Sequence, residues 1–120
     1  MDERGYRKKI ISNMKAVGTY RSEFDKVIDS LAKIYVDMDT ARSQFMASGG
    51  NVVVKHTNKS GATNWAKNPF FLAIEGLQDK ILMYNRELGL TPAGLRKIKG
   101  DVPSNEKPKG LAAVLMKLES

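Results

Sequence analysis

The chain has 120 residues, of which 42% are hydrophobic and 28% are charged, values that are typical of one folded domain and exclude wholesale disorder. The 20 basic and 13 acidic residues give a net charge of +7, which favours a polyanionic partner such as nucleic acid. The absence of cysteine excludes disulfides, thiolate metal sites and cysteine nucleophiles.

The first predicted helix is short and basic. Tyr6, Ile10 and Met14 recur at helical spacing, and Gly18 is a typical helix stop. A basic amphipathic helix can contact a phosphate backbone, although a solvated face over a small apolar contact is an alternative interpretation. Five side chains of this helix are candidate DNA contacts: Arg4, Arg7, Lys8, Lys9 and Lys15.

The second predicted helix covers about residues 23–47 and has the strongest periodicity in the chain. Ser22 and Asp25 have the spacing of a capping box, and Gly49-Gly50 ends the helix. A helix of this length would be about 37 Å long. Its apolar arc is too long to be covered by a single partner helix in so small a protein.

The residue types change in the segment 51–67, and their pattern predicts a short β-hairpin. Val52 to Val54 are β-branched, Lys59 to Gly61 resemble a turn, and Thr63 to Trp65 can return as a second strand. Residues 49–68 contain three lysines and no acidic residue, which suits a phosphate backbone. A lone histidine is weak evidence for a metal site or a general base. The candidate DNA contacts of this segment are Lys55, His56, Lys59 and Lys67.

Two further helices follow, and each begins with a capping residue before proline. Asn68-Pro69 begins a long helix that ends near Leu88, where Gly89 and Leu90 favour a Schellman-type cap. Thr91-Pro92 begins a short helix that extends through Ile98. Its basic residues are also candidate DNA contacts: Arg96, Lys97 and Lys99.

These elements predict a mostly α fold in which helix 23–47 packs antiparallel against helix 69–88, with the β-hairpin between them. Residues 1–99 would form one helical domain for oligomerisation and DNA binding, and residues 100–120 a linker and a short amphipathic tail. Apolar residues beyond a single stripe on each long helix predict self-association. The candidate oligomerisation residues are Val27, Leu31, Ile34, Tyr35, Met38, Ala41, Phe45, Phe71, Ile74 and Ile81.

The sequence lacks the motifs of several common enzyme classes. It has no phosphate-binding P-loop, no Gly-x-Ser-x-Gly and no His-Glu-x-x-His. Asp37 and Asp39 lie two residues apart on a predicted helix and therefore face different ways. The longest apolar run, Leu111 to Met116, is too short to span a bilayer, and the N-terminus lacks the apolar stretch of a signal peptide. We expect a soluble intracellular protein that is not an enzyme and needs no cofactor or metal.

Two of these capping motifs, taken together with their spacing, point to a family more specifically than either motif does alone. Asn68-Pro69 is followed about 20 residues later by Leu88-Gly89-Leu90-Thr91-Pro92. In this arrangement the chain resembles the small terminase subunits of tailed bacteriophages, in their P-twenty-seven-type branch. The resemblance covers roughly residues 22–98.

The resemblance implies a non-enzymatic component of viral DNA packaging in the host cytoplasm. Members of the family bind double-stranded viral DNA as a ring of roughly eight to ten subunits and regulate a large subunit that holds the ATPase and nuclease. The tail would then provide the large-subunit contact through Leu111, Val114, Leu115 and Leu118. Two alternatives are a helix-turn-helix transcription regulator, with Leu88 to Pro92 as its turn, and a helical adaptor that binds no DNA.

Overall fold

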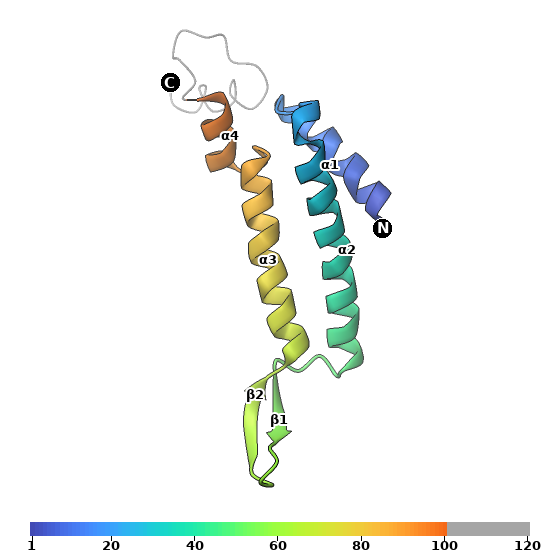
Figure 1. Cartoon of the computed structure of the whole chain (residues 1–120), viewed down its shortest axis with the longest axis vertical. Coiled ribbons are helices and arrows are strands. Elements are labelled where there is room, and N and C mark those ends of the chain that lie inside the picture. Colours follow the sequence, from blue (N-terminus) through green and yellow to red (C-terminus); the bar gives the residue numbers. More distant parts are fainter. Residues whose placement is uncertain (101–120) are drawn as a thin grey trace, which may run out of the picture.

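The computed structural model describes residues 1–100, which form a long helical hairpin with a β-hairpin at one end (Figure 1). In the described residues a helix and a single 3-10 turn come first, followed by a long helix, two strands and two further helices. The elements are α1 (Glu3–Val17), η1 (Ser22–Phe24), α2 (Asp25–Ala47), β1 (Val53–Thr57), β2 (Thr63–Lys67), α3 (Pro69–Glu87) and α4 (Pro92–Lys99). The predicted mostly α fold is therefore confirmed.

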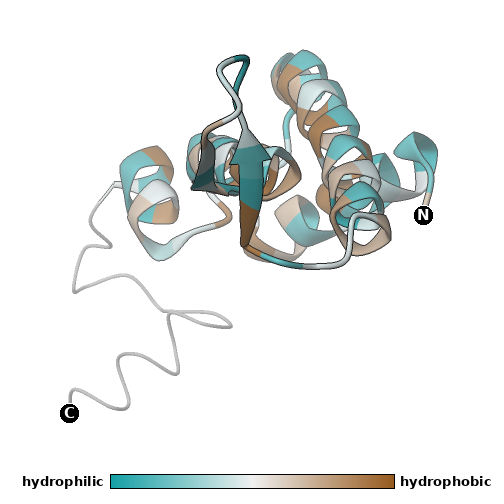
Figure 2. Cartoon of the chain, turned by 90° about the horizontal axis from the view of Figure 1, so that it is seen from below, coloured by the Kyte–Doolittle hydropathy of each residue, from teal (hydrophilic) through white to brown (hydrophobic). Residues whose placement is uncertain are grey.

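The predicted antiparallel pair is present as α2 and α3, which lie side by side along most of their length (Figure 1). Near the β-hairpin, Ile74 of α3 is buried against Met38 and Ala41 of α2. The rings of Phe45 and Phe71 also meet there, with centroids 5.5 Å apart. Viewed from the hairpin end, the helix ribbons carry hydrophobic and hydrophilic residues on different sides, as expected of amphipathic helices (Figure 2).

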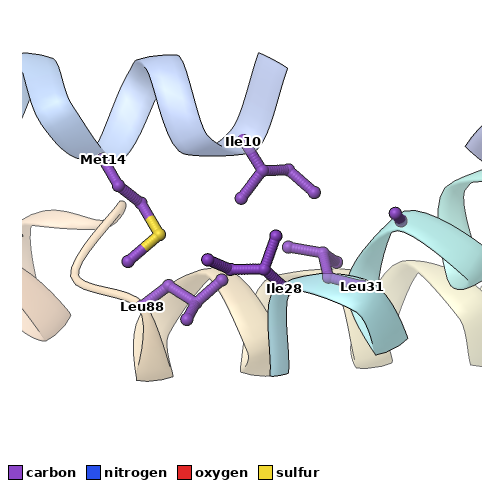
Figure 3. Packing of buried hydrophobic residues seen from close by; sticks show 6 residues of the cluster. Ile10, Met14, Ile28, Leu31 and Leu88 are labelled. Atoms are coloured by element: carbon purple, nitrogen blue, oxygen red, sulfur yellow. The ribbon is translucent and has the colours of Figure 1, made fainter. Parts of the chain in front are cut away.

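A larger apolar cluster closes the opposite end of the pair, where α1 crosses α2. Ile10 and Met14 of α1 point toward Ile28 and Leu31 of α2, and Leu88 at the end of α3 completes the cluster (Figure 3). The long α2 therefore has two partners, α3 along its length and α1 over its first half. This arrangement explains how so long an apolar arc is covered.

Polar contacts hold α1 in its position across α2. The Tyr6 ring stacks on Tyr35 with centroids 5.0 Å apart, and its hydroxyl donates to Asp39 Oδ2 at 2.6 Å. This hydrogen bond to a carboxylate raises the pKa of the Tyr6 phenol above its ordinary value. Arg7 pairs with Asp29 of α2 at 2.7 Å. The first helix is thus fixed by charge and hydrogen bonding as well as by its apolar stripe.

The predicted helix ends are confirmed at three positions. Gly18 takes the left-handed conformation after α1, with φ of +76°. Asn68 caps α3 by accepting a hydrogen bond from Phe70 N at 2.9 Å. After α3, Gly89 is again left-handed, and Leu90 N donates to Asn85 O at 2.8 Å, which is the 6→1 bond of a Schellman cap.

The start of α2 differs from the prediction, because the capping box of Ser22 and Asp25 does not form. Residues Ser22–Phe24 make a 3-10 turn, and neither this turn nor α2 has a side-chain cap. The Asp25 carboxylate instead accepts a hydrogen bond from the Tyr20 hydroxyl at 3.1 Å. This bond raises the pKa of the Tyr20 phenol. A hydrogen bond from a tyrosine five residues earlier has replaced the capping bond that the spacing predicts.

Candidate nucleic-acid interface

The candidate DNA contacts occupy two regions at opposite ends of the helical hairpin (Figure 1). One region is the β-hairpin, which we call the hairpin group and define as Lys55, His56, Lys59 and Lys67. The other contains the basic residues of α1 and α4. Because α3 is 19 residues long, about 28 Å separate its two ends. A single copy therefore offers two separate basic surfaces rather than one.

The hairpin group lies on a regular two-stranded ladder. Lys55 is paired with Trp65, and His56 with Asn64, so these two pairs face opposite sides of the hairpin. Lys55 Nζ lies 5.3 Å from the centroid of the Trp65 ring. Lys59 lies in the turn, at a hydrophilic tip that projects away from the helices (Figures 1 and 2). All four members of the group are exposed.

Asn68 fixes the base of this hairpin to both long helices. Its side chain is almost fully buried and donates from Nδ2 to Ser48 Oγ, beyond the end of α2, and to Asn51 O, both at 3.0 Å. Its backbone N–H donates to Val52 O at 2.7 Å, while its Oδ1 caps α3. The sequence predicts only the cap. The other three bonds come from residues that are distant until the chain has folded.

On α4, the position of the basic residues depends on Gly94. A Cβ atom on Gly94 would lie 2.1 Å from the carbonyl oxygen of Arg86, so α4 approaches the end of α3 more closely than any other residue allows. Arg96, Lys97 and Lys99 follow on α4 and are exposed. Sequence reasoning missed Gly94, although a glycine inside an eight-residue helix is a signal of close backbone approach.

The basic residues of α1 and α4 meet at one point. The Lys99 side chain reaches the C-terminal end of α1, where a Cβ on Gly18 would lie 2.9 Å from Lys99 Nζ. Lys15 of the same helix end lies over the Tyr20 ring, with Nζ 5.4 Å from its centroid. The ends of α1 and α4 therefore form one basic end with Lys15 and Lys99, opposite the hairpin, whereas the N-terminal half of α1 lies beside α2, where Tyr6 reaches Asp39.

Two of the twelve candidate DNA contacts are paired with acidic residues of the same chain. Arg7 pairs with Asp29, and Lys67 pairs with Glu75 of α3 at 2.6 Å. A partly exposed ion pair neutralises charge but contributes little to stability. Arg7 and Lys67 are therefore weaker candidates for phosphate contact than Lys55 and Lys59, which have no acidic residue in their segment.

The structure divides the candidate oligomerisation residues into a buried and a partly buried group. Four of them are buried inside a single copy, at 0 to 7% exposed, and belong to its core: Leu31, Met38, Ala41 and Ile74. Their burial needs no second chain, because α1 and α3 already cover them. The remaining six are partly buried: Val27, Ile34, Tyr35, Phe45, Phe71 and Ile81.

Exposed apolar residues that the sequence prediction missed lie on the outer side of α3. Leu82 and Met83 are each 52% exposed, and Leu72 is 50% exposed. Leu82 borders a shallow groove over α2 and α3 that also includes Tyr35 and Leu90. These residues lie outside the single apolar face predicted for α3. Which side of α3 stays exposed to solvent depends on where α1 and α2 pack.

Within residues 1–100 there is no group of three His, Asp or Glu side chains that could hold a metal ion. The helices of the same region include none that is long and apolar enough to cross a membrane. The predicted large-subunit contact, Leu111, Val114, Leu115 and Leu118, lies outside the described residues.

Comparison with known families identifies the chain. The family model described as phage terminase, small subunit, matches residues 5–104, which is most of the sequence. No curated protein and no solved structure gave a match in the same comparisons. The matched region includes both long helices, the hairpin and α4. The chain therefore belongs to the phage terminase small subunit family and has a role in phage genome packaging.

Proposed function

We propose that this small subunit binds double-stranded phage DNA as a homo-oligomer and regulates the large terminase subunit in the host cytoplasm. In this role it has no enzymatic activity of its own, and the ATPase and nuclease belong to the large subunit. The family match supports DNA and a large subunit as partners in general terms. The spacing of Asn68-Pro69 and Leu88 to Pro92 supports the P-twenty-seven-type branch.

The observation that carries DNA binding is the exposed hairpin group in a segment without acidic residues. Lys55 and Lys59 lie on an arm that projects from the helices, so a phosphate backbone can approach without meeting a carboxylate of that segment. In a homo-oligomer these charges repeat with each copy, which produces a belt of positive potential. The same repetition applies to the basic end formed by α1 and α4.

The DNA proposal predicts a change in salt dependence. Replacing Lys55 and Lys59 together with alanine should lower the slope of log affinity against log salt by roughly 0.9 for each lost phosphate contact, on every duplex sequence alike. Fluorescence anisotropy with a labelled blunt duplex measures the slope. The control is Lys26→Ala with Lys33→Ala, which removes the same charge from exposed positions on α2. An unchanged slope in the hairpin variant would move the DNA surface to α1 and α4.

Assembly is supported by the apolar surface that one copy leaves open. Leu72, Leu82 and Met83 stay exposed on α3, and Leu82 borders the groove over α2. Burying a leucine side chain contributes about 1.5–3 kcal/mol, so a few such contacts per interface are enough to hold neighbouring copies together. A closed ring repeats one such interface between all neighbours.

The assembly proposal predicts that Leu82→Asp lowers the mass of the particle. The substitution places a charge in the groove, whereas helix content should stay unchanged because the side chain is exposed in one copy. Native mass spectrometry gives the mass and circular dichroism the helix content. Met46→Asp, at an exposed position outside the groove, is the matched control. A monodisperse monomer in the unmodified protein at micromolar concentration would contradict the proposal.

A further inference from the structure

Trp65 has an unusual position for the only tryptophan of the chain. It is 69% exposed in the β2 strand of a projecting hairpin, although tryptophan is highly buried on average. Within residues 1–100 no helix covers it, since the hairpin extends beyond the ends of α2 and α3 (Figure 1). The fold of one copy therefore gives no reason for a large aromatic ring at this place.

The surroundings of the ring indicate the kind of ligand it suits. Lys55 is directly opposite Trp65 in the ladder and holds Nζ 5.3 Å from the ring centroid. The next pair on the same face is Thr57 with Thr63, whose hydroxyl oxygens lie 3.2 Å apart. The ammonium group lies over the ring face in a cation–π contact. An aromatic ring with an ammonium group and hydroxyls close by matches a nucleobase linked to a phosphate.

The hairpin holds this surface in a defined geometry. In the turn, Asn58 Oδ1 accepts hydrogen bonds from the backbone N–H groups of Ser60 and Ala62, both at 3.0 Å. Gly61 takes a left-handed conformation there, with φ of +85°. At the other end, the buried Asn68 side chain ties the hairpin to Ser48, just after α2. A ring on such a fixed arm needs little ordering when it binds.

We infer that Trp65 and Lys55 form a stacking platform for unpaired nucleobases, an inference that rests on the proposed DNA-binding function. A base would stack on the indole ring in place of the Lys55 ammonium group, which would move from the ring to the adjacent phosphate. The faces of bases inside a duplex are covered by their neighbours, so the ring can stack on bases of a single strand or of a single-stranded overhang. The platform therefore adds a preference for single strands and overhangs to the charge-driven binding of the hairpin.

Charge favours this ligand over a second copy of the chain. A protein surface docked on Trp65 would have to remove the Lys55 ammonium and the Thr57 and Thr63 hydroxyls from water. A nucleotide instead supplies an anion for the ammonium group and acceptors for the hydroxyls. The hairpin contributes three lysines and no carboxylate, which favours a nucleotide over a protein surface as the ligand.

The test uses the fluorescence of Trp65, which reports on this position alone because the chain has no other tryptophan. The full-length protein is titrated with an oligothymidine, with a blunt duplex, and with a duplex that carries a single-stranded overhang. We expect quenching by the single strand and by the overhang, and little by the blunt duplex. Comparing the titration with oligothymidine and the titration with the overhang duplex distinguishes binding along a single strand from binding at a DNA end.

Variants then measure what the ring contributes. Trp65→Ala should weaken binding of labelled oligothymidine by about 5- to 100-fold, since stacking on one aromatic ring has this magnitude. Trp65→Phe should retain part of the affinity, and all variants should bind the blunt duplex within about twofold of the unmodified protein. Asn64→Ala is the matched control, because Asn64 lies on the opposite face of the ladder and is not among the candidate DNA contacts. Circular dichroism checks that each variant is folded.

Each remaining outcome overturns the inference in a recognisable way. If blunt duplex binds with its usual salt dependence but neither the fluorescence nor the Trp65→Ala variant responds to single strands, the platform is wrong and the proposed function stands. If no DNA of any kind binds, the proposed function fails first. If Trp65→Ala lowers the mass of the particle and DNA leaves the fluorescence unchanged, a second copy covers the ring instead.

Discussion

Replacing Gly94 with alanine should detach α4 from the end of α3. The new Cβ would meet three backbone atoms of Arg86, at 2.1 Å from O, 2.8 Å from C and 2.9 Å from Cα. Backbone atoms cannot move aside as the end of a flexible side chain can, so α4 has to shift as a unit. We expect the free energy of unfolding to fall by about 2 kcal/mol, within the range of other overpacked contacts.

Two measurements separate this effect from a general loss of helix. Urea unfolding gives the free-energy change, and hydrogen exchange should show lost protection in the amides of residues 92–99 while α2 stays protected. Gly76→Ala is the matched control in the middle of α3, where nothing lies within 4 Å of the new Cβ. It should raise stability by roughly 0.5–1 kcal/mol, because alanine is the better helix former. If Gly94→Ala and Gly76→Ala changed the stability in the same direction, that result would contradict the close contact at Gly94.

Replacing Asn68 with alanine should have the second large effect, a loss of about 2–4 kcal/mol of stability. The substitution removes the N-terminal cap of α3, for which the usual cost is about 1 kcal/mol. It also leaves Ser48 Oγ and Asn51 O without the donor that reaches them at 3.0 Å, in a place where Asn68 itself is only 2% exposed. The base of the β-hairpin should loosen together with the start of α3.

A second substitution at the same position separates the contribution of the helix cap from that of the hydrogen bonds to Ser48 and Asn51. Asn68→Asp keeps an oxygen for Phe70 N but cannot donate to Ser48 or Asn51, so its stability should lie below that of the original protein. Asn64→Ala, on the exposed part of β2, is the control and should change stability by less than about 0.5 kcal/mol. Urea midpoints for the variants provide the comparison. Equal midpoints for Asn68→Ala and Asn64→Ala would show that the buried bonds contribute nothing.

The features that the sequence predicts well are those decided by neighbours in the chain. Asn68-Pro69 begins α3 as expected, and Gly89 with Leu90 ends it, because capping depends on residues within one turn of the helix. The β-hairpin is also local, since its two strands are joined by a short turn. For such elements the pattern of residue types carries nearly all the necessary information.

The features that the sequence does not predict depend on contacts between distant segments. Leu31 has the spacing of an interface residue, yet the positions of α1 and the end of α3 place it in the core. The Asn68 side chain donates to Ser48 Oγ and Asn51 O, which lie 20 and 17 residues earlier in the chain. Neither result follows from periodicity, which shows that a face is apolar but not which element covers it.

The sequence likewise predicts one part of the candidate DNA interface, whereas the other part depends on the fold. The acid-free segment around Lys55 and Lys59 is visible in the sequence, and the structure places both residues on an exposed arm. The pairing of Arg7 with Asp29 and of Lys67 with Glu75 is not visible, because each pair joins two different elements. A count of basic residues therefore overstates the charge that is free to meet a phosphate.

The order of the packed elements also bears on how fast the chain folds. The main contacts join α1 with α2, α2 with α3, β1 with β2, and α3 with α4, so most partners are close in sequence. Chains with such low contact order fold in microseconds to milliseconds, since little loop-closure entropy is lost. Contacts between the α1 end and the end of α3 are different; in one of them, Thr19 Oγ1 donates to Leu88 O across 69 residues. Closure of that contact has to wait for the last turn of α3, and Thr19→Val should therefore speed unfolding more than it slows folding.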